Sequence, residues 1–179
     1  MITARSILLI SFFILPNSAI SETLCLSDEK VAFTCNIKVR IASLCASTIV
    51  DPDKGNIQYR FGTRSNIEFQ FPSVPSGQGR EFHLSLATYG GGGETHIRFR
   101  NGSFEYIIYE KTTKGEKDQE GIRPTLFNSG VVVRKGGKQI ANYRCNAAEN
   151  AGISSFVYNF LPLESFEQLQ LSVVGKLRM

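Results

Sequence analysis

Residues 94–110 read Glu-Thr-His-Ile-Arg-Phe-Arg-Asn-Gly-Ser-Phe-Glu-Tyr-Ile-Ile-Tyr-Glu, two alternating runs on either side of Asn101-Gly102. Alternation of apolar and polar side chains is the pattern of a strand with one buried face. Asn-Gly is typical of the type I′ turn, which connects two antiparallel strands through residues with positive φ. This stretch therefore predicts a β-hairpin, from which the rest of the fold can be worked out.

The turn also predicts the register of this hairpin. With Asn101-Gly102 as a two-residue turn, Arg98 faces Glu105, and the further expected pairs are Arg100 with Ser103, Phe99 with Phe104, Ile97 with Tyr106 and Thr95 with Ile108. One face of the hairpin is then apolar and aromatic. The other face carries His96, Arg98 and Glu105, and we expect it to meet solvent.

Outward from this hairpin, most segments with a clear pattern have the period of a strand. We expect strands over residues 31–37, 40–46, 56–61, 66–71, from 82 through Leu84 and Leu86, 131–134, 139–145, 154–160 and 168–174. Residues 163–169 have a helix as an alternative. Gly, Pro and Asn turns separate these runs, so the sequence predicts an all-β fold, an antiparallel barrel or sandwich of roughly eight to ten strands.

The N-terminus resembles a secretion signal. Arg5 precedes an apolar run from Ile7 to Leu15, and the small residues Ala19 and Ser21 fit the sites that signal peptidase recognises. We expect residues 1–21 to be a signal peptide cut after Ser21, and residues 22–179 to form a single all-β domain. The run is far shorter than the ~20 residues of a membrane span, so we expect no membrane anchor.

Four cysteines follow the leader: Cys25, Cys35, Cys45 and Cys145. An even number in an exported chain indicates disulfides, and three pairings of four cysteines are possible. We favour Cys25 with Cys45 and Cys35 with Cys145. The cysteines have none of the close spacings of a zinc site, and the two histidines lie far from them, so no metal site is expected.

The composition excludes several classes of protein. Hydrophobic residues make up 42% of the chain and charged residues 20%, as in ordinary globular domains rather than disordered or multi-span membrane proteins. The formal net charge is only +4, and acidic residues intersperse the basic ones at Lys111, Lys114 and Lys117. We therefore expect no nucleic-acid partner.

No motif for catalysis or cofactor binding stands out. The chain has no G-x-S-x-G, H-E-x-x-H or P-loop sequence, and Gly90–Gly93 lacks the lysine of a phosphate-binding loop. His83 and His96 have the pattern of strand surface residues rather than of a general base with a fixed partner. We predict no catalytic residues, no cofactor and no enzymatic activity.

Binding of a partner is better supported. Several of the six tyrosines have positions that the strand period does not bury, and tyrosine and arginine are enriched where proteins recognise partners. The Gly-rich loop 73–80 is long enough to protrude from a rigid sheet. We predict partner contacts by Ser76, Gly77 and Arg80 of this loop and by Tyr89.

Short motifs resemble a group of small exported proteobacterial proteins without an established activity. They are Phe33-Thr34-Cys35, Tyr59-Arg60-Phe61-Gly62, Gly77-Gln78-Gly79-Arg80, Asn101-Gly102-Ser103-Phe104-Glu105-Tyr106 and Tyr143-Arg144-Cys145. More loosely, the layout is similar to the periplasmic C-type lysozyme inhibitors. That resemblance implies a disulfide-tied β-barrel whose Ser-Gly loop enters the active cleft of an enzyme, with Ser76-Gly77 and Arg80 as the matching positions.

The sequence thus favours an exported binding protein, periplasmic or secreted. Its expected partner is another protein, such as lysozyme, another secreted hydrolase or a toxin, which it would inhibit through the protruding loop. A cell-envelope enzyme without a short motif and a structural component of the envelope are the alternatives.

Overall fold

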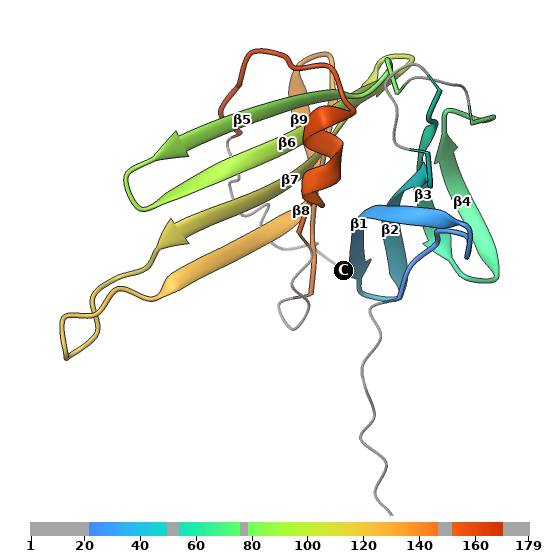
Figure 1. Ribbon diagram of the computed structural model, residues 1–179. Coiled ribbons are helices and arrows are strands. Elements are labelled where there is room, and N and C mark those ends of the chain that lie inside the picture. Colours follow the sequence, from blue (N-terminus) through green and yellow to red (C-terminus); the bar gives the residue numbers. More distant parts are fainter. Residues whose placement is uncertain (1–21, 50–53, 76–78, 147–151, 170–179) are drawn as a thin grey trace, which may run out of the picture.

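The computed structural model describes residues 22–49, 54–75, 79–146 and 152–169, which form two antiparallel sheets packed as a sandwich (Figure 1). The first sheet consists of β1 (Glu29–Ile37), β2 (Arg40–Ser47), β3 (Ile57–Thr63) and β4 (Asn66–Phe71). The second consists of β5 (His83–Tyr89), β6 (Gly92–Asn101), β7 (Phe104–Lys114), β8 (Thr125–Lys135) and β9 (Lys138–Arg144).

The predicted all-β class is confirmed, with a sandwich of nine described strands rather than a closed barrel. In both sheets every strand pairs with its neighbour in the sequence, so each sheet is a meander. Outside the strands, the described residues contain a short 3₁₀ helix, η1 (Ser155–Asn159). No helix in this part of the chain is long and apolar enough to cross a membrane.

The hairpin predicted from residues 94–110 is present as β6 and β7, but the predicted register is wrong by two residues. Asn101 lies opposite Phe104, and Phe99 lies opposite Tyr106. The turn is therefore Gly102-Ser103, in which Gly102 has a φ of 58° and Ser103 has no positive φ. Positive φ at the first position alone is the pattern of a type II′ turn. Because side chains alternate, a shift of two leaves each one on its expected face.

The core lies between the two sheets. It contains fully buried side chains from both sheets: Phe33, Leu44, Ile57, Leu84, Ile97 and Phe99. The predicted cysteine pairs are confirmed, because Cys25 is bonded to Cys45 and Cys35 to Cys145. The first disulfide lies within the N-terminal region, and the second joins β1 to the residue after β9. Two disulfides fit an oxidising compartment outside the cytoplasm.

The prediction that the outer face of the second sheet meets solvent is wrong. Residues 162–164 lie beside the edge strand β5, where Leu84 N–H donates to the carbonyl of Pro162 and Glu164 N–H donates to the carbonyl of Leu84 (2.8 Å each). The segment then covers the outer face, where Phe166 stacks on His96 with ring centres 4.7 Å apart. His96 is therefore fully buried. The prediction failed because nothing in the hairpin itself encodes a cover supplied by a distant segment.

Acidic side chains of this segment bind the arginines beneath it. Glu164 lies 3.0 Å from Arg98, and Glu167 lies 3.2 Å from Arg98 and 2.8 Å from Arg134. Leu169 completes a small apolar cluster on the same face with Ile107, Tyr109 and Val132. Residues 163–169 form neither the helix considered for them nor the start of the predicted strand 168–174, whose remaining residues lie outside the described part.

The predicted strand over residues 154–160 is also wrong, because these residues form η1. The turn of the helix brings Val157 and Phe160, three residues apart, into the core together, where both are almost completely buried. Tyr158 faces outward and is 37% exposed. The alternation of aromatic residues at 156, 158 and 160 imitates a strand, but the segment has no neighbouring strand to pair with.

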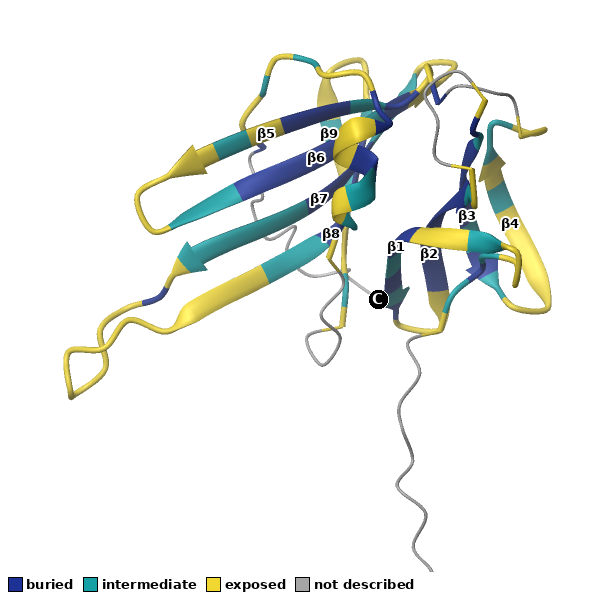
Figure 2. Ribbon diagram, in the orientation of Figure 1, coloured by how far each residue is buried: buried dark blue, intermediate teal, exposed yellow. Residues whose placement is uncertain are grey.

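The second sheet extends beyond the first, as Figure 2 shows by the exposed end of β5 and the exposed start of β8. Phe82 and Leu84 are buried as predicted, but Leu86 is 42% exposed because β5 has by then run past the core. Residues 111–114 and 125–130, for which no strand was predicted, extend β7 to Lys114 and start β8 at Thr125. Alternation of apolar and polar residues reveals a strand only where one face of that strand packs on a core. The extended parts of β7 and β8 lie beyond the core and therefore lack this pattern.

The first sheet has its own cover, formed by the N-terminal end of the described chain. Leu24 N–H donates to Ser43 Oγ (3.0 Å), and Leu24 C=O accepts from Arg60 Nη1 (3.0 Å). The Arg60 side chain is almost completely buried beneath this segment and binds both carboxylate oxygens of Glu29, at 2.6 and 2.8 Å. Each sheet therefore has an inner face in the core and an outer face that is partly covered by a terminal segment.

Candidate functional site

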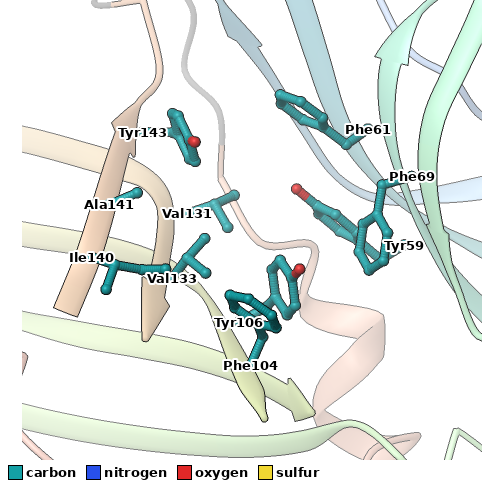
Figure 3. A pocket seen from close by; sticks show the side chains of 10 residues that line it. All are labelled: Tyr59, Phe61, Phe69, Phe104, Tyr106, Val131, Val133, Ile140, Ala141 and Tyr143. Atoms are coloured by element: carbon teal, nitrogen blue, oxygen red, sulfur yellow. The ribbon is translucent and has the colours of Figure 1, made fainter. Parts of the chain in front are cut away.

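A cleft of about 280 Å³ lies between β3 and β4 of the first sheet and β7–β9 of the second (Figure 3). It is built from side chains that the strand period directs toward the core, at a place where the two sheets do not fill the space between them. Six of its ten lining residues are aromatic. The lining consists of Tyr59, Phe61, Phe69, Phe104, Tyr106, Val131, Val133, Ile140, Ala141 and Tyr143.

Stacked rings give the cleft a rigid wall. Phe69 of β4 stacks on Tyr106 of β7, with ring centres 5.1 Å apart, and Tyr106 stacks in turn on Phe99, at 4.9 Å. Near the other side of the cleft, the rings of Phe61 and Tyr143 lie 6.1 Å apart. Such ring pairs add to the energy of apolar burial and restrict rotation of the side chains. The aromatic wall is therefore formed before any ligand binds.

The space inside the cleft is left open by small and branched side chains of the second sheet. Ala141 of β9 lies opposite Val133 of β8, and next to this pair Tyr143 lies opposite Val131. A side chain larger than that of Ala141 would extend into the cleft from its floor. The sequence did identify the excess of partly buried tyrosines, but it did not place them together, because the relative position of two sheets follows from no local pattern.

Three tyrosine hydroxyl groups, those of Tyr59, Tyr106 and Tyr143, point into the cleft (Figure 3). Tyr59 is only 3% exposed, and burial, together with the other two phenols, raises its pKa above the usual value. Burial and Tyr143 likewise raise the pKa of Tyr106. Both phenols are therefore neutral at physiological pH and can donate hydrogen bonds.

The cleft is uncharged as well as aromatic. None of the described residues that line it is Asp, Glu, His, Lys or Arg. An ion that entered this cleft would lose hydration without gaining a countercharge, which is unfavourable. Its volume lies at the lower end of the range for ligand pockets, so it can hold one ring system rather than a long chain. These properties suit a small, neutral and apolar group.

A second hollow, of about 380 Å³, lies at the hairpin ends of β6–β9, and it is polar. It is lined by Arg98, Arg100 and Arg134 together with the carboxylates of Glu105 and Glu167. Each of these arginines already has a carboxylate partner in the chain. Although this hollow is larger, its charges are satisfied within the protein, so the aromatic cleft is the better candidate for a binding site.

The predicted contact residues do not line the aromatic cleft. Ser76 and Gly77 lie outside the described residues, so the structure places neither of them. Arg80 is exposed, and Tyr89 is 43% exposed at the far end of β5. Because a strand rises by about 3.3 Å per residue, the six steps from His83 to Tyr89 separate these two ends by roughly 20 Å. The structure therefore does not bring Arg80 and Tyr89 together.

Tyr89 instead belongs to a group of polar side chains on the outer face. Its hydroxyl donates to Glu94 Oε1 at 3.3 Å, and Lys111 also pairs with this carboxylate. The other oxygen of Glu94 lies 3.2 Å from His96 Nε2. A carboxylate only accepts, so Nε2 carries the proton, and Nδ1 is buried without a hydrogen-bond partner in the part of the chain that the structure describes. Burial lowers the pKa of His96 to about 4, although Glu94 acts in the opposite direction.

The buried His96 predicts that acid destabilises the fold. In the unfolded chain the pKa of this histidine is near its usual 6.5, and in the folded protein it is about 4. As pH falls through this window the unfolded state takes up the proton first, so stability is present above pH 6.5 and declines toward pH 4, by roughly 3 kcal/mol. Urea unfolding at several pH values should show this loss in the wild type. The variant His96→Gln should have a nearly flat profile over the same window.

Two acidic groups provide an internal comparison for that measurement. Burial raises the pKa of Glu29, but Arg60 and the hydrogen bond from Leu26 N–H together lower it below its usual value, and hydrogen bonding to Arg134 lowers that of Glu167. Their contributions to stability are present above the usual pKa of 4.5 and are lost only below it. Equal slopes for the wild type and His96→Gln between pH 6.5 and pH 4.5 would contradict the role given to His96.

Among the described residues, Cys25, Glu29 and Cys45 form a cluster with the spacing of metal ligands. Both sulfurs belong to one disulfide, and Glu29 is held by Arg60. A thiolate is the form of cysteine that binds metals, so this cluster is explained by its disulfide and its ion pair.

Comparison of the chain with protein-family models, with curated proteins and with solved structures gives no match. Function is therefore inferred from the residues of the cleft.

Proposed function

We propose that this protein is an exported binding protein, periplasmic or secreted, that holds a small apolar group in its aromatic cleft. The observation that carries this proposal is a preformed cleft of about 280 Å³ with six aromatic side chains and no charged one. Aromatic walls with a few polar groups are typical of binding sites for small molecules. The only titratable lining groups are tyrosines, which favours binding over acid–base catalysis.

Export is supported by two independent features. Residues 1–21 have the composition of a signal peptide, with a cleavage site near Ser21. All four cysteines lie after that site and form disulfides, which persist in oxidising compartments. A protein that is exported and binds a small apolar group could carry or sequester that group outside the cytoplasm.

Inhibition of lysozyme or another secreted enzyme through loop 73–80 remains a separate prediction. Its support consists of the resemblance of the sequence and the exposure of Arg80. The aromatic cleft supports binding without that loop, so the two ideas can be tested separately.

Filling the cleft tests the proposal. The replacement Ala141→Trp places a large ring on the floor of the cleft and should weaken binding of the neutral dye N-phenyl-1-naphthylamine at least tenfold. The matched control is Lys138→Trp, an exposed position on the same strand. Titration of the dye by its fluorescence compares the two variants directly, because each carries one added Trp in a chain that otherwise has none.

Thermal unfolding of both variants shows whether the fold is kept. Dye binding that is equally strong in Ala141→Trp and Lys138→Trp would place the dye elsewhere and contradict the proposal. No binding by the folded wild-type protein would contradict it as well.

A further inference from the structure

The hydroxyl groups of the cleft have no hydrogen-bond partner among the described residues. Tyr59, Tyr106 and Tyr143 all line the cleft, and none of their hydroxyls bonds to another protein group there. By contrast, the hydroxyl of Tyr109 on the outer face donates to Asn142 at 3.2 Å. The three unpaired hydroxyls are therefore a property of the cleft and not of tyrosines in this fold generally.

Tyr59 is almost completely buried, but its hydroxyl is not one of the buried polar atoms that lack a partner, so the hydroxyl reaches the space of the cleft. Solvent in the cleft can satisfy this hydroxyl while no ligand is bound. A ligand that displaces this solvent without offering an acceptor would leave the hydroxyl unpaired, which costs free energy. A ligand of this cleft is therefore expected to carry an acceptor for Tyr59.

The three hydroxyls come from different strands and converge on one space. Tyr59 belongs to β3, Tyr106 to β7 and Tyr143 to β9, so the group spans both sheets (Figure 3). The three phenols also lie close enough to influence one another electrostatically. One ligand atom inside the cleft can thus be reached by donors from both walls, while the stacked rings of Phe69 and Tyr106 contact its apolar part.

We infer that the ligand of this cleft is a small neutral molecule with a flat ring system and a hydrogen-bond acceptor, such as a carbonyl oxygen, which the hydroxyls of Tyr59, Tyr106 and Tyr143 bind. This inference rests on the proposed function and specifies the ligand class for the same site. Neutrality follows from the uncharged lining, and small size follows from the volume. The acceptor follows from the unpaired donors.

Three probes of similar shape test the inference. 2-Acetylnaphthalene carries an acceptor, 2-ethylnaphthalene lacks one, and 2-naphthoate carries a charge. Because water also binds the ketone, the informative quantity is the change in each affinity on removal of a hydroxyl. The replacement Tyr59→Phe should weaken binding of the ketone about three- to tenfold and leave the affinity for 2-ethylnaphthalene unchanged or higher.

Two further variants keep the test valid if the change at the buried Tyr59 disturbs the fold. Tyr143→Phe changes a residue that is 42% exposed and should show the same selective loss for the ketone. Tyr158→Phe, which removes a hydroxyl on η1 away from the cleft, should leave all affinities unchanged. The wild-type protein should bind 2-naphthoate at least tenfold more weakly than the ketone at pH 7.

The outcomes separate the inference from the proposed function. If both neutral probes bind and the cleft variants Tyr59→Phe and Tyr143→Phe affect them equally, the acceptor is refuted and the binding cleft stands. Stronger binding of 2-naphthoate than of the ketone refutes a neutral ligand. If neither neutral probe binds the folded wild-type protein, the proposed function fails together with the inference.

Discussion

Removal of the Cys35–Cys145 disulfide is expected to lower the free energy of unfolding by about 5 kcal/mol. Its cysteines are 110 residues apart, so the bond closes a long loop in the unfolded chain and strongly restricts that state. The bond also joins the first sheet to the end of the second. The double variant Cys35→Ala/Cys145→Ala tests this expectation by urea unfolding under non-reducing conditions.

The other disulfide is a matched control. Cys25 and Cys45 are only 20 residues apart, and the same loop argument predicts a loss of about 3 kcal/mol for Cys25→Ala/Cys45→Ala. A larger loss for the short loop than for the long one would contradict the entropic account. Because small domains are stable by only about 5–15 kcal/mol, the long-range disulfide is expected to decide whether the fold persists.

The second large effect is expected at Arg60. Its guanidinium binds Gln58, Leu24 C=O and both oxygens of Glu29, and it is almost completely buried. The replacement Arg60→Met removes the countercharge and leaves the Glu29 carboxylate largely shielded from water. We expect a loss of about 3–5 kcal/mol in the free energy of unfolding, measured by chemical denaturation at pH 7.

Two comparisons show whether that loss comes from an unpaired buried charge. In Arg60→Met/Glu29→Met both charges are gone, and much of the stability should return. Arg40→Met breaks the exposed pair with Glu68, where the side chains are 45% and 32% exposed, and should cost less than about 1 kcal/mol. A double variant no more stable than Arg60→Met would refute the explanation.

The sequence predicted those features of the fold that depend on neighbouring residues. Alternation located β1–β4 and the two hairpins of the second sheet, because each of these strands pairs with the next one and buries one face. The cysteine pairing was also confirmed. The turn predicted at Asn101-Gly102 was wrong. The observed turn, Gly102-Ser103, leaves every side chain on the same face of the hairpin, so the hydrophobic pattern does not distinguish the two registers.

Predictions failed where a distant segment decides the environment. His96 and Arg98 have the pattern of a solvent-exposed face. The return of residues 162–169 buries His96 and gives Arg98 carboxylate partners beyond Glu105 of its own hairpin. The aromatic cleft has the same origin. Its tyrosines face the core from their own strands, and the space between them exists only because the two sheets face each other there.

The meander topology has a consequence for the order in which the molecule is completed. A new chain is synthesised from its N-terminus, and β1–β4 pair only with one another, so the first sheet can assemble before the second exists. At that stage Phe33 and Leu44 lack their cover, and Cys35 lacks its disulfide partner, which lies 110 residues further along the chain. The half-made protein, rather than the finished sandwich, is therefore the form most exposed to aggregation and to mispaired sulfurs.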